Sequence, residues 1–267
     1  MAAFSTLSFE LLRCIVDCCG PYDFESLALT CKGLHAACSP LFSRHNSLRR
    51  HYRRFRFVNA DDRKLDPSKL TKDDVWTIPE LLSNIAANPI IAEYIVDGDF
   101  EDRLSLESVR DGSQGDMRAV IRRMEQQDEV DRLRGLVKQS KYLAQLNCDT
   151  DAWFDRILAD TNEWNDDQDF PFAFLLTLLP NIEQLALPNR WNSQSVYLPC
   201  YAAPNVIPDI EKSVPALVSL IVTQANDVES IPGTAPLRKL RTLLPTADVD
   251  HQSGVHIATI APFLALE

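Results

Sequence analysis

Apolar residues near the start of the chain cluster with the spacing of a short amphipathic helix. From Phe9 to Cys19 they fall on one helical face. Ser8 precedes this segment and is a suitable N-cap, because its hydroxyl can accept a hydrogen bond from an orphan backbone amide. The pair Gly20-Pro21 follows it and ends helices. The pattern therefore predicts one helix over about residues 9–19.

A second helical segment is predicted directly after this break. Asp23 is suited to its N-cap, and apolar residues then keep one face from Phe24 to Leu41, until Pro40 ends or kinks the helix. Two or three helices of this size cannot bury a sufficient core alone. We therefore expect them to dock on the rest of the chain, on another protein, or on both.

These two segments resemble an F-box. Residues 7–16 read LSFELLRCIV and residues 23–34 read DFESLALTCKGL. The family pattern is Leu-Pro-x-Glu-Leu-Leu-x-x-Ile, a short break, Asp-Leu-x-x-Leu and a later Cys-Lys/Arg-x-Leu. Ser8 stands where the family usually has proline, and serine also begins helices. The resemblance covers about residues 4–45 and assigns residues 1–45 to an F-box helical hairpin.

The resemblance implies binding and no chemistry. In F-box proteins the apolar face of the hairpin packs on the Skp-type adaptor of a cullin-RING ubiquitin ligase. An exposed apolar patch on so small a helical unit would mark a partner site. The alternative is that the same side chains form intrachain core. Carried over position by position, the adaptor-binding residues are Leu7, Phe9, Leu11, Leu12, Ile15, Leu27, Leu29 and Leu34.

Residues 75–267 contain similar segments that begin with proline and continue with alternating apolar positions. They start at Pro89, Pro180, Pro215, Pro236 and Pro262. Short apolar helices are predicted before three of them, over 80–87, 172–179 and 209–214, and the first of these helices has a capping box at Thr77-Ile78-Pro79-Glu80. A unit of helix, proline and strand resembles a leucine-rich repeat. The fold expected is therefore α/β, an F-box hairpin followed by a mostly helical, irregular solenoid similar to that of filamentous-fungal F-box proteins. An irregular α/β domain without repeats is the alternative.

The irregular spacing of these segments predicts an acidic helical insertion at about residues 97–170. This stretch has 19 acidic and 10 basic residues. Helices are predicted over 117–146, with a break near 126–129, and over 151–160. The last segment, from Ile260 to Glu267, stops as a unit begins and has no polar cap, which predicts a chain truncated at its C-terminus.

Charge is distributed unevenly along the chain. Residues 1–57 have eight basic and four acidic side chains, and the whole chain carries −11, so the remaining residues carry −15. Six of the eight basic residues lie between Arg44 and Arg56, among five aromatic or histidine rings, at the start of a basic connector assigned to residues 46–74. Such a run can bind nucleic acid, or its rings can dock on a neighbouring domain. The acidic total favours docking and no nucleic-acid partner.

The sequence favours a protein without catalytic activity. It contains no GxSxG, HExxH, P-loop or GxGxxG motif. Zinc binding by Cys14, Cys18, Cys19, Cys31, Cys38 and His35 is not expected, because the short CxxC spacing of structural sites is missing. No cofactor, metal site or membrane span is predicted. The odd count of seven cysteines and the lack of a signal-like start indicate the cytoplasm or nucleus.

Together these features predict a substrate-recognition subunit of an SCF-type cullin-RING ubiquitin ligase. The F-box would bind the Skp-type adaptor, and the C-terminal domain would bind a target protein that the sequence does not identify. The alternative is a non-catalytic repeat scaffold with no ubiquitin-ligase role.

Overall fold

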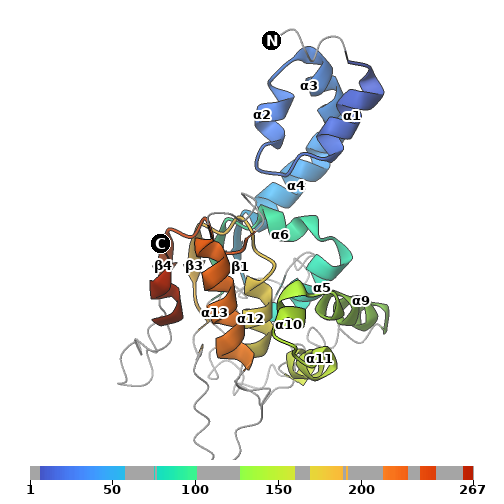
Figure 1. Ribbon diagram of the computed structural model, residues 1–267. Helices are drawn as coiled ribbons and strands as arrows, with labels where there is room; N and C mark the ends of the chain where they lie inside the picture. Colours follow the sequence, from blue (N-terminus) through green and yellow to red (C-terminus); the bar gives the residue numbers. More distant parts are fainter. Residues whose placement is uncertain are drawn as a thin grey trace, which may run out of the picture.

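The computed structural model describes residues 7–57, 75, 77–100, 127–159, 169–188, 191, 213–227, 235–244 and 261–266. Within these residues the protein is a mixed α/β structure with two separate hydrophobic cores. Three helices form a small unit at one end, and the other described elements form a larger domain around a sheet (Figure 1). The two parts are called the N-terminal unit, residues 7–41, and the C-terminal domain, which begins at β1.

The N-terminal unit consists of α1 (Phe9–Asp17), α2 (Phe24–Ala28) and α3 (Lys32–Cys38). The Ser8 side chain accepts a hydrogen bond from the amide of Leu11, which confirms the predicted N-cap. The predicted second helix is divided, because the chain turns at Leu29–Cys31 between α2 and α3. Helices α1 and α3 pack closely: a Cβ on Gly33 would lie 2.9 Å from Cδ1 of Leu12.

One helix connects the two parts. After the 3₁₀ turn η2 (Ser39–Leu41), which contains Pro40, helix α4 (Phe42–Tyr52) runs directly into strand β1 (Arg54–Arg56). The boundary predicted at residue 45 therefore lies inside α4. The first residues assigned to a basic connector form the end of this helix and the edge strand of the sheet, and residues 58–74 of that connector lie outside the described residues.

The sheet has four parallel strands that follow one another in chain order, β1, β2 (Asp97–Asp99), β3 (Gln184–Ala186) and β4 (Thr242–Leu244). The middle residue of each strand shares one row. This row faces the core, because Phe55 and Leu185 are buried. The β2 position of this row suits glycine, because a Cβ on Gly98 would lie only 2.5 Å from the Phe100 ring and would clash with it. The row consists of Phe55, Gly98, Leu185 and Leu243.

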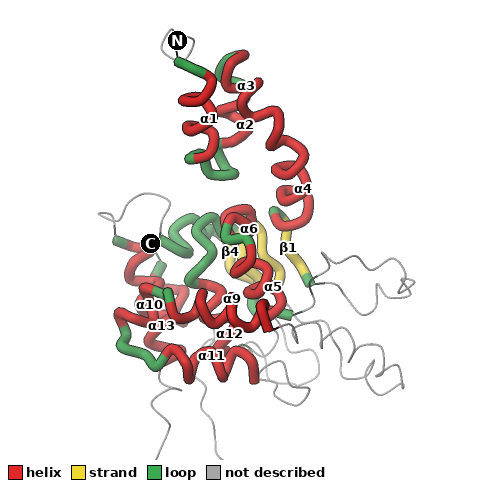
Figure 2. The backbone as a smooth tube through the Cα atoms, turned by 90° about the vertical axis from the view of Figure 1, so that its right-hand side faces the viewer, coloured by secondary structure: helices red, strands yellow, loops and turns green. Residues whose placement is uncertain are grey.

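Helices lie against the core-facing side of the sheet. Figures 1 and 2 show α12 (Asp169–Leu176) and α13 (Ser213–Asn226) beside the strands. The ring of Phe100, next to β2, lies 5.6 Å from Phe55 and 5.6 Å from Phe172 of α12, measured between centroids. Helix α5 (Ile78–Ala87) starts with the predicted capping box. Helix α6 (Ile90–Tyr94) packs on α4 and α5, and the 3₁₀ helix η6 (Ala261–Ala265) packs on α13.

The acidic segment expected as an insertion forms part of the main core. Helices α9 (Gln127–Lys138), α10 (Lys141–Gln145) and α11 (Thr150–Ala159) lie within it. Leu133, Trp153 and Phe154 are completely buried in the larger hydrophobic cluster. The described part of the helix predicted over 117–146 breaks at Gln139–Ser140, where the Ser140 hydroxyl accepts from the Leu143 amide. Residues 117–126 lie outside the described residues.

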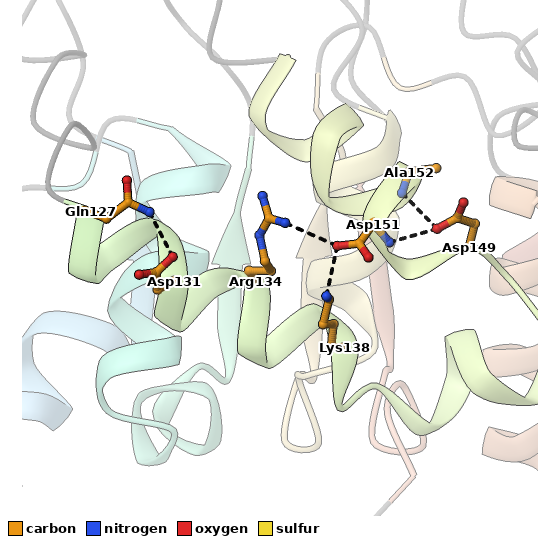
Figure 3. Close-up of polar contacts among 7 residues, drawn as sticks. All are labelled: Gln127, Asp131, Arg134, Lys138, Asp149, Asp151 and Ala152. Carbon is orange, nitrogen blue, oxygen red and sulfur yellow. Dashed lines mark hydrogen bonds and ion pairs between the residues drawn. The ribbon is translucent and has the colours of Figure 1, made fainter.

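Charged side chains of this segment also connect helix α11 to α9. Arg134 and Lys138 of α9 both contact one oxygen of Asp151, at 3.3 and 3.1 Å (Figure 3). Asp149 accepts hydrogen bonds from the amides of Asp151 and Ala152 at the start of α11. These contacts therefore link the polar surfaces of α9 and α11, whose apolar surfaces face the core.

Three of the proline-led segments predicted to be strands are not strands, and these predictions were wrong. Residues 215–222 lie within α13, residues 90–94 form α6, and residues 262–264 belong to η6. Only the segments beginning at Pro180 and Pro236 reach a strand, β3 and β4. An apolar run does not distinguish a buried strand from a buried helix by its composition. In α13 the proline stands in the first turn, where a missing amide is tolerated.

Candidate docking surface

Exposed apolar side chains are concentrated on the N-terminal unit. Among the described residues six large hydrophobic side chains are exposed, and four of them belong to this unit. Leu29, just after α2, is 83% exposed, and Leu11 of α1 is 53% exposed. The far larger C-terminal domain contributes only Leu244 and Leu264. The other two of the four are Phe9 and Tyr22.

The predicted adaptor-binding residues divide into three groups. Leu12 and Leu34 are buried in the core of the unit. Three are half-buried and pack against that core, namely Leu7, Ile15 and Leu27. Three are exposed, namely Phe9, Leu11 and Leu29. Leu12 and Leu34 therefore form intrachain core, as in the alternative interpretation, and of the eight predicted residues only the exposed group is fully accessible in this conformation.

Helix geometry explains the division on α1. Leu12 and Val16 are four residues apart, lie on the same side of the helix and point into the small core. Leu11 lies about 100° around the helix from Leu12, because successive residues rotate by that angle. The core of the unit contains only seven buried residues, so α1 cannot turn its whole apolar surface inward. Leu11 therefore faces solvent beside the half-buried Ile15.

A polar junction joins the N-terminal unit to the C-terminal domain at His45 of α4. The ring is 4% exposed, stacks on Phe24 of α2 with centroids 4.3 Å apart, and shares a hydrogen bond of 2.7 Å between Nδ1 and the Tyr94 hydroxyl. Burial lowers the pKa of His45 and raises that of Tyr94. Arg49 of α4 donates to Glu25 of α2 at the same place. Phe24 belongs to the small core and Tyr94 to the large one, so His45 bridges the two.

A second contact between the two parts lies around the loop between α1 and α2. The Lys239 ammonium is 4.4 Å from the centroid of the Tyr22 ring and donates to Asn181 Oδ1 at 2.7 Å. Asn181 in turn donates from Nδ2 to the carbonyl of Glu93 at 2.8 Å. Among the described residues, the Tyr22 contact and the His45 junction therefore both hold the N-terminal unit to the C-terminal domain, in addition to the covalent connection through α4.

The basic run between Arg44 and Arg56 is divided between these contacts and solvent. Its rings at His45, Tyr52 and Phe55 are buried, as expected if they dock on a neighbouring domain. Arg44 donates to Asn88 at 3.2 Å. The exposed arginines include Arg54 and Arg56, which flank the buried Phe55 on β1.

The face of the sheet opposite the core-facing row has a polar pattern. Arg54, Asp97, Gln184 and Thr242 are register partners across the four strands. Side chains two residues apart on a strand share a face, so Arg56, Asp99, Ala186 and Leu244 form the second row of this face. Opposite charges stand in register between β1 and β2 in both rows. This face is the second candidate surface for a partner.

The described residues show no arrangement suited to metal binding. Within the ranges that the structure describes, no three His, Cys, Asp or Glu side chains gather as metal ligands. Six cysteines of this part of the chain are free. Burial raises the pKa of Cys19 and Cys38, which favours the thiol over the thiolate that binds metals. Among the described helices, none is long and apolar enough to span a membrane.

Sequence reasoning expected the rings of the basic run to dock on a neighbouring domain, but it did not identify what the His45 ring would contact. His45 lies in a run of basic residues, where a partner for its ring has no sequence signature, and Tyr94 was assigned to a strand. Asn181 and Lys239 lie in the proline-led segments, but the contact of Lys239 with Tyr22 joins residues about 220 positions apart in the chain. Only the tertiary arrangement brings these side chains together.

Comparison of the chain with protein-family models, with curated proteins and with solved structures finds no match.

Proposed function

We propose that this protein is a substrate-recognition subunit of an SCF-type cullin-RING ubiquitin ligase. The observation that carries the proposal is the exposure of Phe9, Leu11 and Leu29 on a small helical unit whose sequence resembles an F-box. Large apolar side chains left in solvent on one small unit mark a surface that a partner covers. The Skp-type adaptor of these ligases is the partner that the resemblance implies.

The C-terminal domain would bind the target protein. Among the described residues, helices lie on one side of the four parallel strands, and the charged register pairs of β1 and β2 on the other face offer polar recognition. We infer that the domain is a degenerate leucine-rich-repeat-like solenoid, because each strand lies beside its predecessor. The mechanism is proximity: a target held near a charged ubiquitin-conjugating enzyme experiences a high effective concentration of the donor.

The adaptor interface is tested by binding of purified full-length protein to a purified Skp-type adaptor, measured by calorimetry. Leu11→Asp and Leu29→Asp should each weaken binding at least about tenfold, as for a buried interface anchor. Leu264→Asp is the matched control, because Leu264 is 67% exposed and lies in the C-terminal domain. Leu12→Asp is unsuitable, since Leu12 is core and its loss would unfold the unit.

Adaptor binding that survives both Leu11→Asp and Leu29→Asp would contradict the interface, and an absence of binding by the wild-type protein would favour the scaffold. The ligase role has a separate test in cells. Proteins labelled in proximity to both the wild-type protein and Leu11→Asp, but more abundant with Leu11→Asp, are the expected targets. If no labelled protein changes in abundance, the ligase role is contradicted.

A further inference from the structure

His45 differs from the other groups at the junction because its burial favours the uncharged ring. Its Nδ1 is occupied by the Tyr94 hydroxyl at 2.7 Å. Its Nε2 is shielded from solvent and has no hydrogen-bond partner among the described residues. The nearest carboxylate oxygen, Glu25 Oε1, is 3.8 Å from Nε2 and already accepts from Arg49. A proton added to the ring would therefore place an additional charge beside an ion pair that is already balanced.

We propose that His45 is an acid-sensitive joint, which holds the N-terminal unit against the C-terminal domain while its ring is neutral and loosens that contact when the ring is protonated. The ring contacts α2 through Phe24 and α6 through Tyr94, so a change in it acts on both cores. A looser joint would let the N-terminal unit change its orientation about α4.

The direction of the pH effect depends on which arrangement of the joint, docked or undocked, lets the His45 ring bind a proton more readily. Burial lowers the pKa of His45 in the docked arrangement, whereas an undocked, solvated ring would have the ordinary value of about 6.5. The undocked state therefore binds the proton more tightly. The contribution of His45 to docking is complete above about pH 6.5 and is lost as the pH falls below that value.

Other charged groups face the joint and must be separated from it. From α2 there is Glu25, from α4 Arg49 and Arg44, and from α6 Glu93 beside Tyr94. Burial raises the pKa of Glu93, and its Oε2 would lie 3.4 Å from a Cβ on Gly20 of the N-terminal unit. A carboxyl whose pKa is raised by docking favours docking as the pH falls. Glu93 thus acts with the opposite sign to His45 and partly masks it.

Hydrogen exchange of the full-length protein, followed by mass spectrometry, measures the joint without any adaptor. Exchange rates at about pH 7.5 and about pH 5 are corrected for the intrinsic pH dependence of amide exchange. We expect the corrected rates over α2 and α4 to rise about three- to tenfold at the lower pH, because one unit of pKa difference is a tenfold change in a docking constant. Peptides of α11 are the internal reference and should not change.

Three variants decide the origin of the effect. His45→Gln can still hydrogen-bond to Tyr94 but does not titrate, so its corrected rates should no longer rise at the lower pH. They should fall slightly instead, because Glu93 still titrates with the opposite sign. His35→Gln, which changes an exposed histidine of α3, should behave as the wild type. Glu93→Gln removes the opposing carboxyl and should make the acid response steeper.

A wild-type protein with no acid response, an acid response that persists in His45→Gln, or one that disappears in Glu93→Gln would each overturn the proposal. The Glu93→Gln result keeps the test decisive if His45→Gln does not fold. Because no adaptor is present in these measurements, their outcome is independent of the proposed ligase function.

Discussion

The two hydrophobic cores of this protein differ in how much apolar surface they leave in solvent. The N-terminal unit buries seven residues and leaves four large apolar side chains exposed. The C-terminal domain buries several times as many residues, with completely buried rings such as Trp153 and Phe172, and leaves two exposed among its described residues. Small units have too little interior for all their apolar residues. The comparison indicates that the apolar side chains which the small core cannot accommodate are the ones accessible to a partner.

The largest effect on stability is expected in the larger core. Trp153 is completely buried and packs edge-on against Phe170 with centroids 5.0 Å apart. Trp153→Ala should lower the free energy of unfolding of the C-terminal domain by about 3–5 kcal/mol, measured by denaturant titration. A loss below about 1 kcal/mol would mean that this core is much looser than the contacts indicate.

Two adjacent leucines of α1 allow a buried and an exposed position of the N-terminal unit to be compared. Leu12 is 4% exposed and Leu11 is 53% exposed. Leu12→Ala should destabilise the unit by about 2–5 kcal/mol, whereas Leu11→Ala should change its stability by less than about 0.5 kcal/mol. Unfolding followed by circular dichroism measures both. Equal losses would show that Leu11 is part of the core and would remove the main support for a docking surface.

A small effect is expected at the ion pairs on the surface of the larger domain. Asp151 is about half exposed and contacts Arg134 and Lys138 (Figure 3). Asp151→Asn should cost at most about 1 kcal/mol, because exposed charges are well solvated and the geometry is already held by packing. Raising the salt concentration should reduce the difference between variant and wild type. A loss of several kcal/mol that ignores salt would show that α9 and α11 depend on this contact.

Local features of the fold were predictable where a few neighbouring residues decide the outcome. Ser8 caps α1, and Thr77 with Glu80 forms the capping box of α5, because both depend on residues three apart. The helix predicted over 151–160 is α11. The apolar segment at Pro215 was misassigned because packing against α12, which lies far away in the sequence, selects a helix there.

The candidate docking surface was predictable only as a group of apolar residues, not residue by residue. The sequence indicates which residues of the N-terminal unit are apolar, but not which of them its small core can accommodate. Leu34 is buried and Leu29 is exposed, although the resemblance implies adaptor binding for both. Leu34 lies on α3 and is buried in the small core, whereas Leu29 lies at the end of α2, so the division depends on how the three helices pack. The junction at His45 depends on contacts 49 positions apart and has no local signal.

Helix α4 has its first residues beside the small core and its last residue, Tyr52, in the large one, and it continues into β1 without a flexible segment. One residue inserted into a helix rotates everything beyond it by about 100° and moves it by about 1.5 Å. The eleven residues of α4 therefore set the direction in which the N-terminal unit points from the sheet. The sequences on either side of α4 could diverge widely without altering this direction. A change in the length of α4, however, would reorient the N-terminal unit relative to the sheet.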